Sequence, residues 1–185
     1  MAKVIIVNGA PGSGKTTLVK KLASDLKIGY ITKDQFKELL GDSLGTPAEY
    51  ATSAAYGMIA SIAVFDVMET LTSEGLTYIV ESAFWADIAN ERFNTMTNNT
   101  NRYIQVYVTC DHRVRKQRFD ERVANNKRHP VHWDGTYADA SEEDINMKYR
   151  PIEFADLKTL FYDTTNPKDE DYTTLINDIQ EWRDM

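Results

Sequence analysis

The segment at residues 9–16 has the sequence GAPGSGKT and satisfies the pattern G-x-x-x-x-G-K-[ST] in full. Its glycines allow backbone angles closed to other residues, so that successive N–H groups can converge on an anion. Lys15 can reach the β- and γ-phosphates of a nucleoside triphosphate, and the Thr16 hydroxyl can ligate Mg²⁺. The segment therefore predicts a site for ATP with Mg²⁺. The residues expected to hold the nucleotide here are Gly9, Gly12, Ser13, Gly14, Lys15, Thr16 and Thr17.

A carboxylate follows the next short apolar run of the chain. The run at residues 30–32, Tyr-Ile-Thr, leads directly into Lys33 and Asp34. A kinase that phosphorylates a hydroxyl needs a group that orients this hydroxyl and accepts its proton. We therefore expect Asp34 to be the catalytic base. The alternative that Asp34 caps the helix after the strand is compatible with this role.

The elements that must position these residues alternate between strands and helices. Residues 4–7 are a continuous β-branched run, typical of a strand buried on both faces of a parallel sheet, and residues 15–26 have apolar side chains at helical spacing. A phosphate loop requires this context, which opposes the alternative of a turn that only caps a helix. We expect further strands at 28–32, 77–80, 103–108 and 159–162, and further helices at 33–40 (ending at Gly41), 47–72, 87–97, 113–123, from Ser141, and at 169–182.

This alternation predicts an α/β fold of the P-loop NTPase type: a five-stranded parallel sheet with helices on both faces, in one domain over residues 1–185. Ligands of such sheets bind at the carboxyl ends of the strands. We expect residues 42–76 to form a helical insertion on the acceptor side. Residues 124–140 contain Pro and Gly and are expected to form a lid, which would keep water away from ATP.

Two motifs carry a resemblance to a known group of enzymes. The sequences GAPGSGKTT at 9–17 and TKDQF at 32–36, whose Asp lies 19 residues beyond Lys15, resemble the AAA-type P-loop kinases of the branch that includes polynucleotide kinases, zeta toxins and chloramphenicol phosphotransferases. In that branch the matching Asp is the general base toward an acceptor hydroxyl. The resemblance implies the same role for Asp34, with ATP and Mg²⁺ as cofactors.

The resemblance also implies roles for Glu81, Arg118 and Arg122. Glu81 opens ESAFW, which resembles the branch's element of a strand followed by an acid and small residues; that acid serves the metal's outer shell or the acceptor. The two arginines resemble a pair at the lid entrance of adenylate-kinase-like enzymes, where the first stacks on adenine and the second contacts phosphates. Their i, i+4 spacing puts both on one helix face, and Arg122 is a catalytic candidate. The alternatives are a solvated charge at Glu81 and surface salt bridges for the arginines.

The composition of residues 42–76 bears on the charge of the acceptor. They contain no Lys or Arg, which an acceptor with its own phosphate would require, so a small hydroxyl-bearing molecule is favoured. The net charge of −7 disfavours nucleic acid as a partner. Arg128 could close over the nucleotide. His129 and His132 are interpreted as lid structure or acceptor contacts, because no Cys or third His lies nearby to complete a zinc site.

Composition favours a globular cytoplasmic protein. The chain has 42% hydrophobic and 26% charged residues, one cysteine (Cys110), and an N-terminus without the features of a signal peptide. No apolar run approaches the roughly 18 residues of a membrane span, so no membrane partner is expected. The oligomeric state stays open.

Together these features predict an ATP-dependent phosphotransferase that moves the γ-phosphoryl of Mg-ATP to the hydroxyl of a small molecule. Lys15, Asp34 and Arg122 are its expected catalytic residues, and Thr16 and Glu81 its expected metal residues. A nucleoside-monophosphate or nucleic-acid 5′-hydroxyl kinase is one alternative. An ATP-binding regulatory or toxin-like module is another. A GTPase switch is disfavoured because the chain has no Asn-Lys-x-Asp sequence.

Overall fold

A computed structural model describes residues 1–96, 100–125, 128–132 and 140–185. The elements run in the order β1 (Lys3–Asn8), α1 (Lys15–Leu26), β2 (Gly29–Thr32), α2 (Lys33–Leu44), α3 (Tyr50–Ser73), β3 (Thr77–Glu81), α4 (Ala86–Met96), β4 (Arg102–Thr109), α5 (His112–Ala124), α7 (Glu142–Lys148), β5 (Lys158–Asp163) and α8 (Asp169–Asp184). They match the expected series of strands and helices. The end of the helix expected at 87–97 and parts of the expected lid, 126–127 and 133–139, lie outside the described residues.

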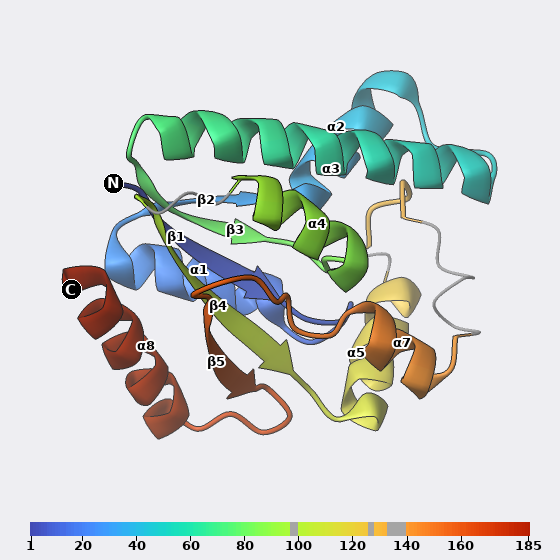
Figure 1. Ribbon diagram of the computed structural model, residues 1–185. Helices are drawn as coiled ribbons and strands as arrows, with labels where there is room; N and C mark the ends of the chain where they lie inside the picture. The colour runs from blue at the N-terminus through green and yellow to red at the C-terminus, as the bar shows by residue number, and fades with distance from the viewer. Residues whose placement is uncertain (97–99, 126–127, 133–139) are drawn as a thin grey trace.

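The five strands form one parallel sheet in the order β2-β3-β1-β4-β5, as predicted. β1 lies at its centre and alternates its side chains between two cores. Ile5 and Val7 pack against α1 and α8 on one face. Val4 and Ile6 pack against α3 and α4 on the other (Figure 1). Burial of β1 on both faces accounts for its unbroken β-branched sequence.

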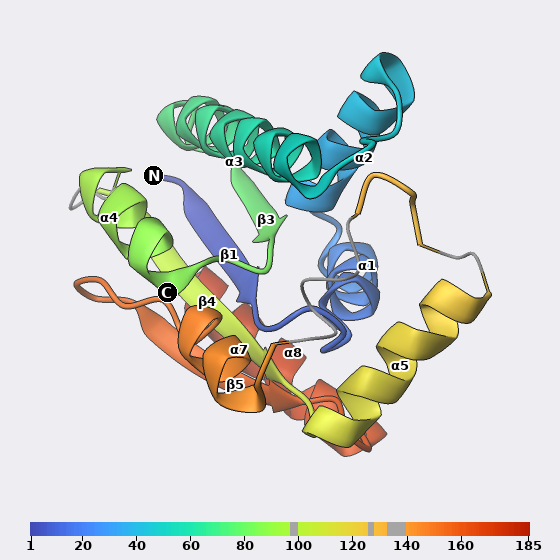
Figure 2. The same cartoon turned by 90° about the vertical axis from the view of Figure 1, so that its right-hand side faces the viewer.

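The carboxyl ends of the strands gather the residues that the sequence singles out. Glu81 is in register with Val7 of β1 on one side and with Thr32 of β2 on the other. The starts of α1 and α2 therefore lie at the same edge of the sheet. Figure 2 shows α2, α5 and α7 around this edge.

One boundary differs from the prediction: α2 does not end at Gly41 but continues to Leu44. Gly41 is buried, and a Cβ atom on it would lie 2.8 Å from the Cβ of Val131. A close approach of another segment therefore requires this glycine inside the helix. The helix ends at Gly45, which has a φ of 97° and donates its N–H to the Gly41 carbonyl at 2.9 Å.

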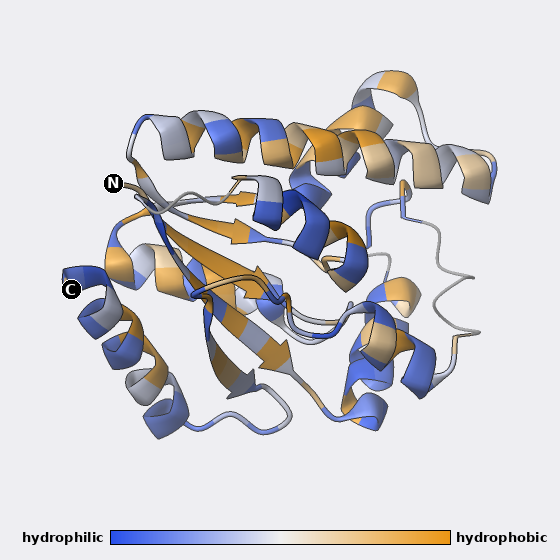
Figure 3. Ribbon diagram, viewed as in Figure 1, coloured by the Kyte–Doolittle hydropathy of each residue, from blue (hydrophilic) through white to orange (hydrophobic). Residues whose placement is uncertain are grey.

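α3 corrects the expectation that no segment could cross a membrane. By length and composition alone, α3 is long and apolar enough to cross a membrane: its 18-residue window has a mean hydropathy of 1.4. The reason is that no charged residue occurs between Glu49 and Asp66. Its side chains Val64, Phe65 and Met68 belong to the core against the sheet, and 28% of the apolar window is buried in the protein. Figure 3 shows the apolar stretch continuing along α3.

Candidate active site

The phosphate loop joins β1 to α1 and has the backbone that an anion cradle needs. Gly12 and Gly14 have φ values of 83° and 87°, a region that favours glycine. Ser13 is buried, and its Oγ has no hydrogen-bond partner within the described residues. A buried hydroxyl without a partner costs free energy unless a ligand satisfies it. This orphaned atom suits a phosphate oxygen.

Lys15 is held inside the loop rather than extended into solvent. Its side chain is buried, and its Nζ donates to the Ala10 carbonyl at 2.9 Å. Burial lowers the pKa of Lys15, while the carboxylates of Glu81 and Asp34 counteract this effect. The three groups therefore interact electrostatically at the loop. The ammonium is positioned where the phosphates of a nucleotide would relieve its desolvation.

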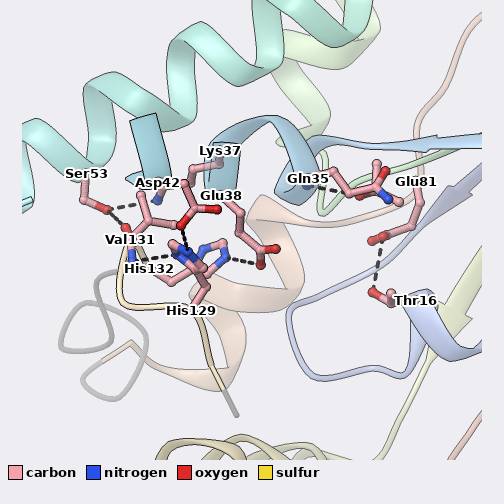
Figure 4. A network of polar contacts seen from close by, with 11 residues as sticks. Thr16, Gln35, Lys37, Glu38, Asp42, Ser53, Glu81, His129, Val131 and His132 are labelled. Atoms are coloured by element: carbon pink, nitrogen blue, oxygen red, sulfur yellow. Dashed lines mark hydrogen bonds and ion pairs between the residues drawn. The ribbon is translucent and has the colours of Figure 1, made fainter. Parts of the chain in front are cut away.

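Thr16 and Glu81, the two residues expected at a metal, are hydrogen-bonded to each other. The Thr16 hydroxyl is exposed and donates to Oε2 of Glu81 at 3.3 Å. Glu81 is only 4% exposed, so it is not a strand-end charge that meets solvent. Burial raises the pKa of Glu81, and attraction by Lys15 opposes this shift. This pair is drawn in Figure 4.

Asp34 lies in the first turn of α2, and its carboxylate does not cap the helix. The cap is Thr32, whose Oγ1 accepts the N–H of Gln35 at 3.2 Å. Asp34 is accessible to solvent although protein atoms crowd it. Crowding raises its pKa, but the positive charges of His132, Lys33, Lys15 and Arg128 outweigh this effect and hold the pKa below its usual value. Asp34 is therefore an ionised carboxylate beside the phosphate loop.

The two arginines of α5 lie close to the loop in different ways. Arg118 donates to the carbonyl of Thr164 at 2.6 Å and to its hydroxyl at 3.0 Å. The Nη2 of Arg122 is 3.7 Å from the position that a Cβ on Gly12 would occupy. The acidic residues beside the arginines pair with other side chains: Asp120 with Lys116 at 2.9 Å and Glu121 with Gln117 at 2.8 Å. Arg122 thus faces the loop, and Arg118 is held by the turn after β5.

Two residues that hold the site together were not predicted. Thr164 donates to the Ser13 carbonyl at 2.6 Å and so fastens the turn after β5 to the phosphate loop. Asn8 accepts the N–H of Phe84 at 3.1 Å and donates to the carbonyl of Arg150 at 3.2 Å. Asn8 could have been noticed as a polar residue that ends an apolar strand. No local signal marks Thr164, since its partner is 151 residues away in the sequence.

The expected lid at 124–140 begins within α5, which ends at Ala124, and its residues 128–132 lie on α2 and α3. His129 bonds Asp42 at 3.1 Å and His132 bonds Glu38 at 3.2 Å. The Ser53 hydroxyl donates to the Val131 carbonyl at 2.8 Å. Figure 4 shows these contacts side by side. Burial lowers the pKa of His132, against the attraction of Asp34. Residues 128–132 therefore pack on α2 and place His132 near Asp34.

The two aromatic residues after Glu81 divide between core and surface. Phe84 is buried in the core with Phe65 and Phe93, whereas Trp85 is 46% exposed. Cys110 accepts a hydrogen bond from Arg118 at 3.3 Å. Within the described residues no cluster of three or more His, Cys, Asp or Glu could hold a metal by itself. A Mg²⁺ ion at Thr16 would thus need oxygens of nucleotide and water, as is usual for this ion.

The fold and the loop define a P-loop kinase. A family profile described as an AAA domain matches residues 4–142, and the chain belongs to this family. A candidate kinase from Chloroflexus aurantiacus has a solved structure that is 30% identical, with 97% of each chain covered and a TM-score of 0.82.

Two more distant structures have the same fold. Kti12 from Chaetomium thermophilum, solved with ADP-AlF3, is 14% identical over 96% of this chain and 97% of that one, with a TM-score of 0.67. A gluconokinase from Sinorhizobium meliloti is 12% identical over 97% of each chain, with a TM-score of 0.53. Among the curated proteins none matches the chain.

Proposed function

We propose that this protein transfers the γ-phosphoryl group of Mg-ATP to a hydroxyl of a small-molecule acceptor. The observation that carries this proposal is the position of Asp34 in the first turn of α2, at the sheet edge where the phosphate loop begins, with its carboxylate attracted to Lys15. A nucleotide-binding module without an acceptor has no need of a carboxylate at this position. A hydroxyl kinase needs one.

The chemical step assigns a role to each side chain. The acceptor oxygen forms a bond to the γ-phosphorus while the bond from this phosphorus to the oxygen bridging to the β-phosphate breaks. The acceptor proton passes to Asp34, and ADP leaves with the electron pair of the broken bond. Lys15 and the loop amides stabilise charge on the β- and γ-phosphates, and Arg122 stabilises charge that develops on the transferred group.

The residues present fit a magnesium ion. The exposed Thr16 hydroxyl would ligate it directly, and Glu81, which accepts from this hydroxyl at 3.3 Å, would hold a water of its outer shell. Bound Mg²⁺ would neutralise phosphate charge during transfer.

A coupled assay of ADP release tests the proposal. The protein is incubated with Mg-ATP and a panel of hydroxyl compounds (sugars, polyols, hydroxy acids, nucleosides), and each rate is compared with the rate without acceptor. We expect one chemical class to raise ADP release and to yield a phosphorylated product by mass spectrometry. Hydrolysis that no acceptor accelerates, with free phosphate as the only product, would contradict transfer and favour the regulatory module.

A further inference from the structure

We propose that this protein has a second anion site, between α5 and α7, which binds a phosphate-sized oxyanion through the guanidinium group of Arg115. The site is separate from the phosphate loop, and the inference goes beyond the proposed phosphotransfer. It starts from a cavity of about 70 Å³ between these two helices, whose positions Figure 2 shows. The residues that line this cavity include His112, Arg115, Lys116, Phe119, Asp120 and Ile145.

Arg115 is a buried cation without a carboxylate partner. The residue is only 4% exposed, and within the described part of the chain it forms no ion pair. Its only side-chain hydrogen bond there joins Nη2 to Nδ1 of His112 at 3.2 Å, so that Nε and Nη1 have no partner among these residues. Buried arginines are rare unless they are paired, because an isolated charge in the interior costs free energy. The position of Arg115 therefore suits an anion.

His112 does not supply the missing negative charge. An arginine side chain has only donors, so Nδ1 of His112 accepts this hydrogen bond, and the ring is neutral with its proton on Nε2. The imidazole therefore orients the guanidinium group of Arg115 without neutralising it.

The carboxylate at the cavity is already paired with a different cation. Asp120 binds the ammonium group of Lys116 at 2.9 Å, and both side chains are 58% exposed. This pair carries no net charge and lies in contact with solvent. Water in the cavity would solvate the free donors of Arg115 but would leave its charge uncompensated. An anion would satisfy both the donors and the charge.

The size of the cavity sets the class of ligand. Its volume of about 70 Å³ exceeds the roughly 10–15 Å³ that one water molecule needs, but it is well below the roughly 300 Å³ at which pockets for larger ligands begin. A guanidinium group matches the oxygens of a phosphate with two parallel hydrogen bonds. The cavity therefore fits a tetrahedral oxyanion, either free or as the phosphate group of a small ester.

The cavity and the nucleotide contacts lie on different faces of α5. His112 and Phe119, seven residues apart, share the face that lines the cavity. Arg118 and Arg122, four residues apart, share the neighbouring face, and Arg118 bonds the turn after β5. The ligand of the cavity is therefore separate from the nucleotide.

Arg115 connects the cavity to the phosphate loop. A Cβ atom on Gly12 would lie 2.9 Å from Cγ of Arg115, so the aliphatic part of this side chain packs against the loop. The guanidinium group at its end bonds His112 at the cavity. An anion bound to this group would hold Arg115 in place and with it the contact between α5 and the loop.

Calorimetric titration of the full chain with inorganic phosphate tests the site. The protein is first saturated with Mg-AMPPNP, so that the phosphate loop is filled, and glycerol 3-phosphate is titrated in parallel. We expect saturable binding of one phosphate per chain. Tighter binding of the ester would identify the phosphate group of a small metabolite as the ligand, and tighter binding of inorganic phosphate would identify the free ion. Binding of neither would mean that the cavity holds only water and would overturn the inference.

The variant Arg115→Met locates the binding. Methionine keeps an aliphatic side chain against Gly12 and removes the guanidinium group. The affinity for phosphate should fall about 10- to 100-fold, the loss typical of a hydrogen bond to a charged group. Arg113→Met is the matched control, because Arg113 is exposed on the same helix, lies outside the cavity lining and changes the net charge equally. Equal affinity in Arg115→Met and the wild type would refute the site.

A second variant decides the case in which Arg115→Met does not fold. Ala140 also lines the cavity, and Ala140→Leu would fill its volume without changing any charge. We expect at least tenfold weaker binding of phosphate with the affinity for Mg-AMPPNP unchanged, and wild-type affinity for phosphate would count against the site. Failure of Mg-AMPPNP itself to bind would refute the proposed function; the titrations with phosphate are then made in a Lys15→Ala background, which weakens the loop as a competing site.

Discussion

The nucleotide side and the acceptor side of this site are built in different ways. The nucleotide side is one continuous loop between neighbouring elements, and a second layer of hydrogen bonds from Thr164 and Arg118 fastens it. The side around Asp34 is assembled from segments far apart in the sequence, because residues 128–132 pack on α2 and α3. In the proposed phosphotransfer the loop would bind the phosphates common to all such enzymes, and the assembled side would determine which molecule is phosphorylated.

The largest effect is expected from a variant that disables the phosphate loop. Lys15→Ala removes the buried ammonium that interacts with Glu81 and Asp34. We expect phosphotransfer to fall by about 10²- to 10³-fold or more, as for loss of a preorganised group that stabilises transition-state charge. ADP-release kinetics measure this loss. Lys20→Ala, on the exposed side of α1, is the control and should be active.

The next variant acts on the acceptor side alone. Asp34→Asn keeps the shape of the side chain and removes its negative charge. Turnover should fall about 10²- to 10⁴-fold, the usual contribution of a general base, while the Kd for Mg-AMPPNP stays within about twofold of wild type, because the loop is untouched. Calorimetry and steady-state kinetics together separate the two effects. Unchanged turnover would exclude Asp34 as the base.

The fastening of the loop can be weakened without touching a ligand contact. Thr164→Val removes the donor to the Ser13 carbonyl and the acceptor for Arg118, at nearly constant volume. Loss of a buried hydrogen bond of this kind should weaken nucleotide binding roughly tenfold, or about 1.4 kcal/mol. Thr173→Val is the control, since that hydroxyl bonds only within exposed α8. Equal affinity in both variants would show that the turn after β5 does not support the loop.

The pH dependence of kcat/KM tests whether His132 acts on Asp34. The pKa of Asp34 is lowered because the charges of His132, Lys33, Lys15 and Arg128 together outweigh its desolvation. The active carboxylate therefore persists above the ordinary aspartate range, and kcat/KM should fall only when the pH drops below it. In His132→Gln the attraction is weaker and the pKa of Asp34 rises, so this acid limb should move to higher pH. No movement would mean that His132 does not act on Asp34.

The smallest effects come from two glycines that differ in their surroundings. Gly57→Ala in α3 adds a methyl whose nearest neighbour is 3.9 Å away, and should stabilise the protein by about 0.5–1 kcal/mol. Gly41→Ala places the same methyl 2.8 Å from Val131 and should lose this gain by displacing residues 128–132. Thermal unfolding compares the two variants. Equal stabilisation of both would argue against the close packing of Val131 on α2.

The sequence is informative where a signal is local. Periodicity located the strands and helices, and the contiguous pattern at 9–16 located the phosphate loop. The predicted end of α2 was wrong because Gly41 does not stop the helix. This glycine allows the close approach of Val131, which is 90 residues away in the sequence. Thr164 was missed for the same physical reason: its partner, the Ser13 carbonyl, is brought to it only by the fold. Glu81 and Asp34 could be singled out from the sequence because they lie at the carboxyl ends of β3 and β2.

The central claim is that residues 9–16 bind polyphosphate through Lys15 while Asp34 serves only the acceptor. Calorimetric titration of Mg-AMPPNP into wild type, Lys15→Ala and Asp34→Asn tests it most directly. The account predicts one nucleotide per chain in wild type and Asp34→Asn, and binding at least tenfold weaker in Lys15→Ala. No heat with the wild type, or equal binding by all three proteins, would contradict it.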